Sequence, residues 1–211
     1  MVKLSGKMNS IKKDNTEQKI MDAAHAVFLE KGMDGARMQE IANEAGINKA
    51  LLHYYFRTKQ KLFEAIFKRV IKHSFPIVSK TLLSDIPIRE KMDLFIDSYL
   101  NLLSKNPFLP AFLLKEIHRD PEFLANVIKG SGINPDKILT MLGKEMDKGN
   151  IRRMNPRDLI TNIIALSVFP FAAKPLLSIM LFNGDQKAYK IFLQERRETV
   201  KEFIFNAIFL K

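Results

Sequence analysis

Residues 37–59 gather side chains that can bind a polyanion. Lys49 carries a positive charge, and His53 and Tyr54 add an imidazole and a phenol close by in the sequence. Lysine suits phosphate oxygens and guanine acceptors, while a small residue such as Ala50 allows close approach to the major groove. The residues that we expect to contact double-stranded DNA are Arg37, Met38, Gln39, Asn48, Lys49, Ala50, Leu51, His53, Tyr54, Tyr55 and Lys59.

The apolar residues of the same segment predict two short helices joined by a tight turn. Ile41 and Ala42 fall on the inner side of the first helix, and Leu52 falls on the inner side of the second. Gly46 lies between them and can adopt the positive φ that reverses the chain. This is the pattern of a helix-turn-helix, whose second helix enters the major groove. Taken alone, the segment also fits an ordinary pair of packed helices.

Individual positions indicate how the second helix would be used. Asn48 is the expected N-cap, so Lys49 opens the helix and points outward; a solvated lysine is the alternative. We expect Tyr55 to be partly core and partly a phosphate contact. Lys59 falls in the first turn of a further helix, capped by Thr58, where free N–H groups favour an anion. We therefore expect Lys59 to bind a phosphate.

Amphipathic helices are predicted on both sides of this motif, over residues 16–31 and from residue 59 onward. In order and spacing, residues 15–70 resemble the TetR family of bacterial transcriptional regulators. The matching residues are Ile20, Ala23, Ala24, Phe28, Gly32, Ile41, Ala42, Ala45, Gly46, Ile47, Lys49, Leu52, Tyr55, Phe56, Lys59, Leu62 and Phe63. Two positions depart from the family pattern: Leu51, which could touch a thymine methyl, and Arg37, which replaces a capping Ser or Thr and is expected to reach a phosphate.

The resemblance implies an all-α protein with an N-terminal three-helix DNA-binding domain and a C-terminal helical domain for effector binding and dimerisation. We expect a disordered basic arm at 1–13, a helix-turn-helix domain at 14–72 with its motif at 37–56, and a helical domain at 73–211. About nine to ten helices are expected. Past the motif they cover 59–83, 87–103, 110–118, 121–129, 135–148 and 159–182, followed by a terminal helix after the turn at 183–185.

Composition narrows the function classes. The chain carries a formal net charge of +11, and its first 72 residues hold 14 basic and eight acidic side chains, which favours a polyanionic partner. The absence of cysteine excludes a thiolate nucleophile or a disulfide framework. No His-x-x-x-His pair and no glycine-rich phosphate loop is present, so we expect no metal, no cofactor and no catalytic residues. We expect a cytoplasmic protein without a membrane span, because Pro170, Lys174 and Pro175 interrupt the apolar run at 159–182.

The expected effector and dimer residues lie in the C-terminal two thirds. Apolar and aromatic side chains there favour a hydrophobic or amphipathic small-molecule effector, although core packing explains most of them equally well. The weak ligand candidates are Phe95, Tyr99, Phe112, His118, Met141, Ala165, Phe169 and Ala172. In the terminal helix one apolar stripe could pair with a second copy of the chain. The expected interface residues are Phe192, Val200, Phe203, Ile204 and Ala207.

These observations predict a sequence-specific DNA-binding transcriptional regulator that acts as a homodimer on a two-fold symmetric operator. A repressor released by its effector is the favoured form. A small-molecule-binding or sequestering protein with a non-functional DNA head is the alternative. A helical enzyme whose reactive residues the sequence does not reveal is a more remote one.

Overall fold

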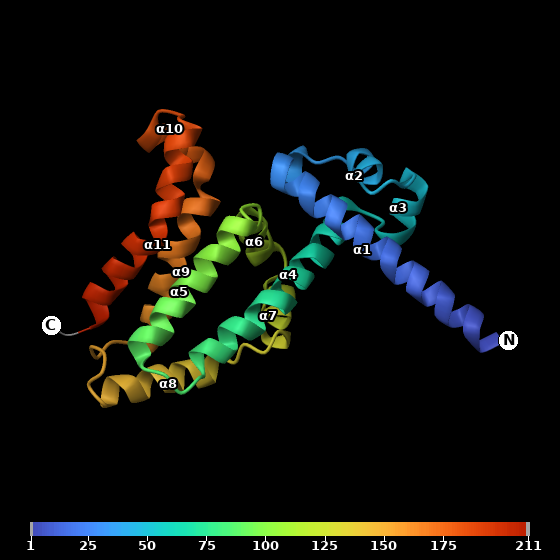
Figure 1. Ribbon diagram of the computed structural model, residues 1–211. Helices are drawn as coiled ribbons and strands as arrows, with labels where there is room; N and C mark the ends of the chain where they lie inside the picture. Colours follow the sequence, from blue (N-terminus) through green and yellow to red (C-terminus); the bar gives the residue numbers. More distant parts are fainter. Residues whose placement is uncertain (1, 210–211) are drawn as a thin grey trace. The chain divides into compact units, whose positions relative to one another are not determined.

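The computed structural model describes residues 2–209, with side chains from residue 15 onward, and shows eleven helices and no strand in that range (Figure 1). The chain divides into two compact units, Met1–Val70 and Ile71–Lys211. The all-α expectation is confirmed. The sequence placed the domain boundary two residues later, after residue 72.

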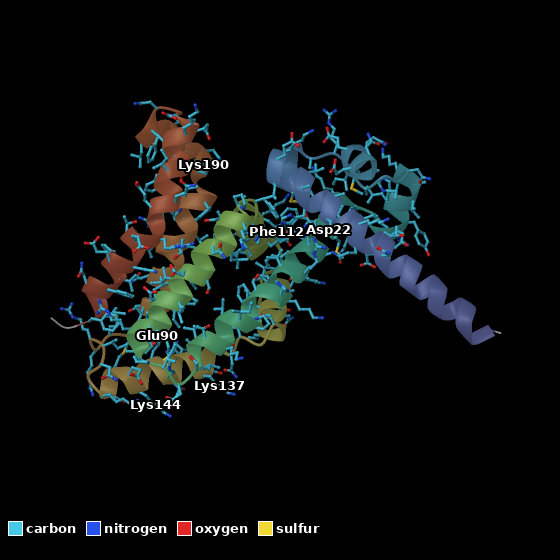
Figure 2. All side chains as sticks on the ribbon, viewed as in Figure 1. Asp22, Glu90, Phe112, Lys137, Lys144 and Lys190 are labelled. Carbon is cyan, nitrogen blue, oxygen red and sulfur yellow. The ribbon has the colours of Figure 1, made fainter. Side chains whose placement is uncertain are left out.

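The first unit contains α1 (Val2–Gly35), α2 (Met38–Glu44), α3 (Lys49–Tyr55) and the first half of α4 (Lys59–Leu82). Its core is built from the apolar stripes of these helices, including Phe28 of α1 and Phe63 of α4, whose ring centroids lie 4.9 Å apart. An ion pair of 2.8 Å between Arg69 Nη1 and Asp22 Oδ1 also joins α4 to α1; Figure 2 labels Asp22. The unit thus holds α2 and α3 on a framework of two longer helices.

Helix α1 differs from expectation at both ends. Its backbone includes residues 2–13, where the sequence predicts a disordered arm; Met1 and the side chains of residues 1–14 lie outside the described residues. No proline interrupts this stretch, so nothing in it forbids helical backbone. At the other end the helix continues to Gly35, past the expected limit at residue 31, with a kink at Gly32, which has φ 68° and ψ 178°.

The second unit is a helical bundle. Helices α5, α9 and α11 pack on one another around its core, which includes Ile96, Leu142, Ile163 and Ile204. Prolines open several of its helices, because a residue without an N–H group costs nothing in the first turn. The remaining bounds are α5 (Ile88–Lys105), α6 (Leu109–Arg119), α7 (Pro121–Gly130), α8 (Pro135–Asp147), α9 (Pro156–Ala172), α10 (Lys174–Phe182) and α11 (Gln186–Ile208).

The sequence predicts one buried, kinked helix over the apolar run at 159–182, whereas the structure divides this run into two helices. It forms α9 and α10, which meet at Ala173 with a bend of 78°. Pro175 favours a new first turn there. Six large apolar side chains of the pair are exposed: Ile164, Phe169, Leu176, Ile179, Met180 and Leu181. Within the described range no single helix is long and apolar enough to cross a membrane. Taken together, α9 and α10 reach the length and apolar composition of a span, but they are bent by 78°.

Candidate nucleic-acid interface

The turn between α2 and α3 is fixed by backbone hydrogen bonds. Gly46 adopts a φ of 65°, which other residues rarely take. The Gly46 amide donates to the carbonyl of Asn43, and the Ile47 amide donates to the carbonyl of Ala42, both at 3.0 Å. Ala42 itself is completely buried. The reversal predicted at Gly46 therefore exists and sets the angle at which α3 leaves α2.

Helix α3 is anchored on its inner face and capped at its start. The Asn48 side chain accepts a hydrogen bond of 2.8 Å from the Leu51 amide, which is the predicted N-cap. Leu52 is completely buried, and Phe56 closes the helix as a second buried residue. The opposite face of α3 is thereby held outward.

That outward face carries the predicted contact residues. Lys49, Ala50, His53 and Tyr54 are exposed, and Tyr54 presents 71% of its surface to solvent. The Tyr54 ring meets the ring of half-buried Tyr55 edge to face, with centroids 5.5 Å apart. Leu51 is also exposed. The face combines one ammonium, one imidazole and one phenol around a small residue, which suits base edges and phosphates.

Helix α2 begins differently from the usual cap. Arg37 has an extended backbone and an exposed side chain, as a phosphate contact requires. Its amide donates a hydrogen bond of 3.2 Å to the carboxylate of Glu40, which also accepts one of 3.1 Å from Lys31. These two hydrogen bonds hold the pKa of Glu40 below its ordinary value. Sequence reasoning missed Glu40, although an acidic residue three positions after the cap is a known signal.

Two other α2 residues sit beside this cap. Gln39 is exposed and donates a hydrogen bond of 2.9 Å to the Asn43 side chain, whereas Met38 is half-buried. A residue that the sequence analysis did not select, Arg57, is exposed directly after α3, and its carbonyl lies 3.1 Å from His53 Nδ1. Its place in the loop that follows the outward helix was the available signal.

The sequence predicts that Lys59 offers its ammonium group to a phosphate, but in the structure that group is already bonded within the protein. Its Nζ donates hydrogen bonds to the carbonyls of Asp34 at 3.2 Å and Ala36 at 3.0 Å. The carbonyls at the end of α1 need donors, and a half-buried lysine supplies them. The predicted cap of α4 is confirmed, since Thr58 Oγ1 accepts from the Lys61 amide at 3.1 Å.

Comparison with known proteins agrees with this geometry. Residues 20–66 match the family model described as bacterial regulatory proteins, tetR family. These residues carry the DNA-binding domain of the TetR family. The relatives and the solved structures that resemble the chain support a TetR-family, DNA-binding transcriptional regulator rather than an enzyme.

The relatives include both a transcriptional activator and a transcriptional repressor. The chain is 20% identical to the transcriptional activator FasR of Mycolicibacterium smegmatis over 76% of this chain and 72% of that protein. It is 23% identical to the transcriptional repressor AcnR of Corynebacterium efficiens over 69% and 74% of the two chains. The crystal structure of FadR from Bacillus subtilis in complex with stearoyl-CoA shares the fold, with a TM-score of 0.60 at 18% identity over 89% of this chain and 96% of that one.

The predicted effector residues of this protein lie in different surroundings. Phe112 is buried, and Phe95 stacks on Tyr99 with centroids 5.8 Å apart, so these rings serve the core. Burial raises the pKa of the Tyr99 phenol. His118, Ala165 and Phe169 are exposed instead, and Ala172 is half-buried. Among the eight candidates, Met141 alone lines the cavity between α8 and the α4–α5 junction.

The predicted dimer stripe divides between two faces of α11. Val200 and Ile204 are only 1% and 2% exposed and pack in the core of their own chain, so their assignment to an intersubunit contact is wrong. They lie four residues apart, on the face that α5 and α9 cover. Phe203, at 63% exposure, and Ala207 lie on the adjacent, open face. Phe192 is half-buried against the rings of Phe182 and Tyr189.

Proposed function

We propose that this TetR-family regulator binds a two-fold symmetric operator as a homodimer and acts as a repressor that a small amphipathic effector releases. The observation that carries the DNA-binding part is the outward face of α3, where Lys49, His53 and Tyr54 stand exposed on a helix with a side-chain cap. Such a face can reach base edges without deforming the helix that supports it.

Two copies are needed for tight binding. Helix α3 has seven residues and is therefore roughly 10 Å long, which spans only a few base pairs. Paired recognition helices reading successive major grooves stand about 34–36 Å apart, or a multiple of that distance. The exposed apolar side chains of α9, α10 and α11, among them Phe169, Ile179 and Phe203, support pairing through this part of the second unit.

Release by an effector requires a connection between ligand and DNA head. Helix α4 supplies it, because Lys59–Leu82 runs from the first unit into the second without interruption. A ligand that favours a second arrangement of the end of α4 changes DNA affinity by its differential affinity for the two arrangements. The relative AcnR is a transcriptional repressor, which supports repression here. The structural neighbour FadR was crystallised with stearoyl-CoA, which supports an amphipathic effector. We place the protein in the cytoplasm, beside the chromosome that it reads.

The test of this function is selection of DNA by the purified protein. Fragments of the genomic DNA of the source organism are incubated with the protein, and the retained fragments are sequenced. A shared motif with two-fold symmetry supports the proposal. A reporter gene placed behind that motif then gives the sign of regulation, since a repressor lowers its expression and an activator raises it.

A further inference from the structure

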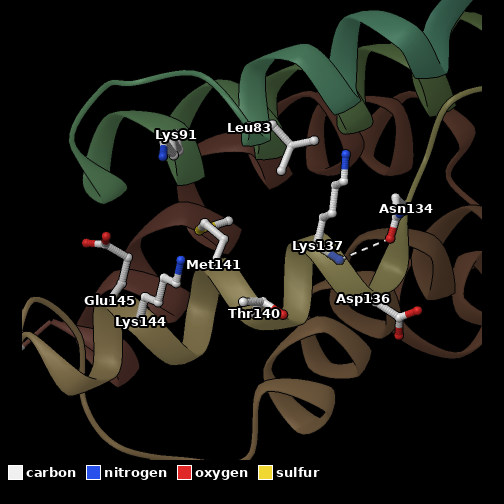
Figure 3. Close-up of a pocket in the computed structure, with 9 residues that line it drawn as sticks. All are labelled: Leu83, Lys91, Asn134, Asp136, Lys137, Thr140, Met141, Lys144 and Glu145. Atoms are coloured by element: carbon white, nitrogen blue, oxygen red, sulfur yellow. Dashed lines mark hydrogen bonds between the residues drawn. The ribbon is translucent and has the colours of Figure 1, made fainter.

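The second unit contains a cavity of about 500 Å³ between α8 and the junction of α4 and α5 (Figure 3). Three lysines line it: Lys91 from α5, and Lys137 and Lys144 from α8, where Figure 2 labels the last two. Leu83, the residue after α4, and Met141 of α8 add apolar surface. The cavity therefore offers both positive charge and an apolar wall.

Among the described residues, the three ammonium groups lack hydrogen-bonded or ion-paired partners. No hydrogen bond or ion pair within residues 15–209 involves the Nζ atom of Lys91, Lys137 or Lys144. Lys91 has the greatest need of a charged partner, because it is only 8% exposed. A buried ammonium group is costly unless an anion pairs with it. A bound anion would supply that partner.

The acidic residues of the cavity wall do not cancel this charge. Glu145 accepts hydrogen bonds of 2.7 Å from Asn150 and 2.8 Å from Lys148, so its carboxylate is already paired with groups outside the wall. These bonds hold the pKa of Glu145 below its ordinary value, and the charge of Lys91 adds a smaller effect in the same direction. Asp136 points away from the space between α8 and α4 (Figure 3). A surplus of positive charge is left facing the cavity.

We propose that this cavity binds an amphipathic anion, whose carboxylate or phosphate group pairs with Lys91, Lys137 and Lys144 while its apolar part packs on Leu83 and Met141. The inference rests on the proposed function in one respect, in that it names this anion as the effector. A ligand here touches Leu83 and therefore acts on the end of α4 directly. The site lies apart from the aromatic residues that the sequence favoured.

Calorimetric titration without DNA tests the site. The probes are octanoate and octyl phosphate below their micelle-forming concentrations, with 1-octanol as the uncharged control. We expect both anions to bind and octanol to bind at least about tenfold more weakly, because a charge-assisted hydrogen bond to the lysines is lost. The stronger of the two anions identifies the head group.

Lysine substitutions locate the binding. Lys91→Met and Lys137→Met keep the apolar stem of lysine and remove its charge, and each should weaken anion binding about tenfold. Lys137→Arg should retain binding. Lys129→Met, which removes an exposed lysine of α7 outside the cavity, should change nothing. Equal affinity for octanol and the anions, or anion binding that survives both methionine variants, would overturn the proposal.

A second measurement separates this inference from the proposed function. Saturating anion should lower retention of the selected DNA by the wild type and leave retention by Lys137→Met unchanged. Anion binding that leaves DNA retention unchanged would refute the effector role. A wild type that retains no specific DNA in the absence of probe would refute the proposed function, while the calorimetry, done without DNA, still decides whether the cavity binds anions.

Discussion

The ammonium group of Lys59 lies 3.0 Å from the carbonyl oxygen of Ala36, a residue that is itself 2% exposed. A second bond reaches the carbonyl of Asp34. Lysine 59 thus ties the start of α4 to the chain between α1 and α2. Its role is to hold the helix-turn-helix in place, which leaves the phosphate contacts to other side chains.

Lys59→Met is therefore expected to lower the free energy of unfolding, and to leave the electrostatic attraction between the protein and DNA nearly unchanged. Loss of the two hydrogen bonds should cost about 1–3 kcal/mol, measured by urea unfolding followed by circular dichroism. At salt concentrations where the variant is folded, the slope of log affinity for DNA against log salt concentration should equal that of the wild type. A slope reduced as much as in a phosphate-contact variant would contradict this role.

Lys49→Ala should show the opposite behaviour. Lys49 is exposed and is not part of the core, so the unfolding curve should not move. In a dimer the substitution removes two phosphate or base contacts, and the salt slope should fall by about two units. Fluorescence anisotropy with the selected operator measures it, with Lys129→Ala as a control distant in sequence from the motif. An unchanged slope would exclude Lys49 from the interface.

Substitutions at two neighbouring residues of α11 should have different effects, one on the stability of the fold and the other on dimer formation. Ile204→Ala leaves a cavity in the core of its own chain and should lower stability by about 2–5 kcal/mol. Phe203→Glu places a charge on the exposed face and should leave a folded monomer with weak DNA binding. Light scattering gives the mass of each variant. A Phe203→Glu protein that is still dimeric would remove this face from the interface.

Acid should weaken the cap of α2. The folded-state pKa of Glu40 is lowered by its bonds to Lys31 and Arg37, so its stabilising effect is complete above the unfolded value of about 4.5 and is lost as pH falls through the folded value. The difference in unfolding free energy between wild type and Glu40→Gln should therefore shrink between pH 7 and pH 3. A constant difference would show that the charge of Glu40 contributes nothing.

Much of the first unit could be predicted from the sequence, because the residues that determine its turns and helix caps lie close together in the chain. Gly46, Asn48 and Leu52 lie within seven residues, and each meets a local requirement that only a few residue types satisfy: a positive φ, a side-chain acceptor and an apolar inner face, respectively. Lys59 could not be assigned in this way. Its partners are backbone carbonyls 23 and 25 residues away, and any residue type supplies a carbonyl.

In the second unit the predictions fail where two helix faces adjoin. Phe203 and Ile204 both fit an apolar stripe of helical period, and only the packing of α5 and α9 on α11 shows which one is covered. The lysine cavity was equally hidden, because Lys91 and Lys137 are far apart in the sequence and each reads as an ordinary surface lysine.

The central claim is that α3 reads DNA sequence, and sequencing the genomic fragments retained by wild type and by a Lys49→Ala, Tyr54→Ala double variant tests it most directly. We predict that the wild type enriches one motif of two half-sites with two-fold symmetry, their centres about 34–36 Å or a multiple of it apart. The folded double variant should lose that enrichment. Fragments without a shared motif, or the same motif retained by the double variant, would contradict the account.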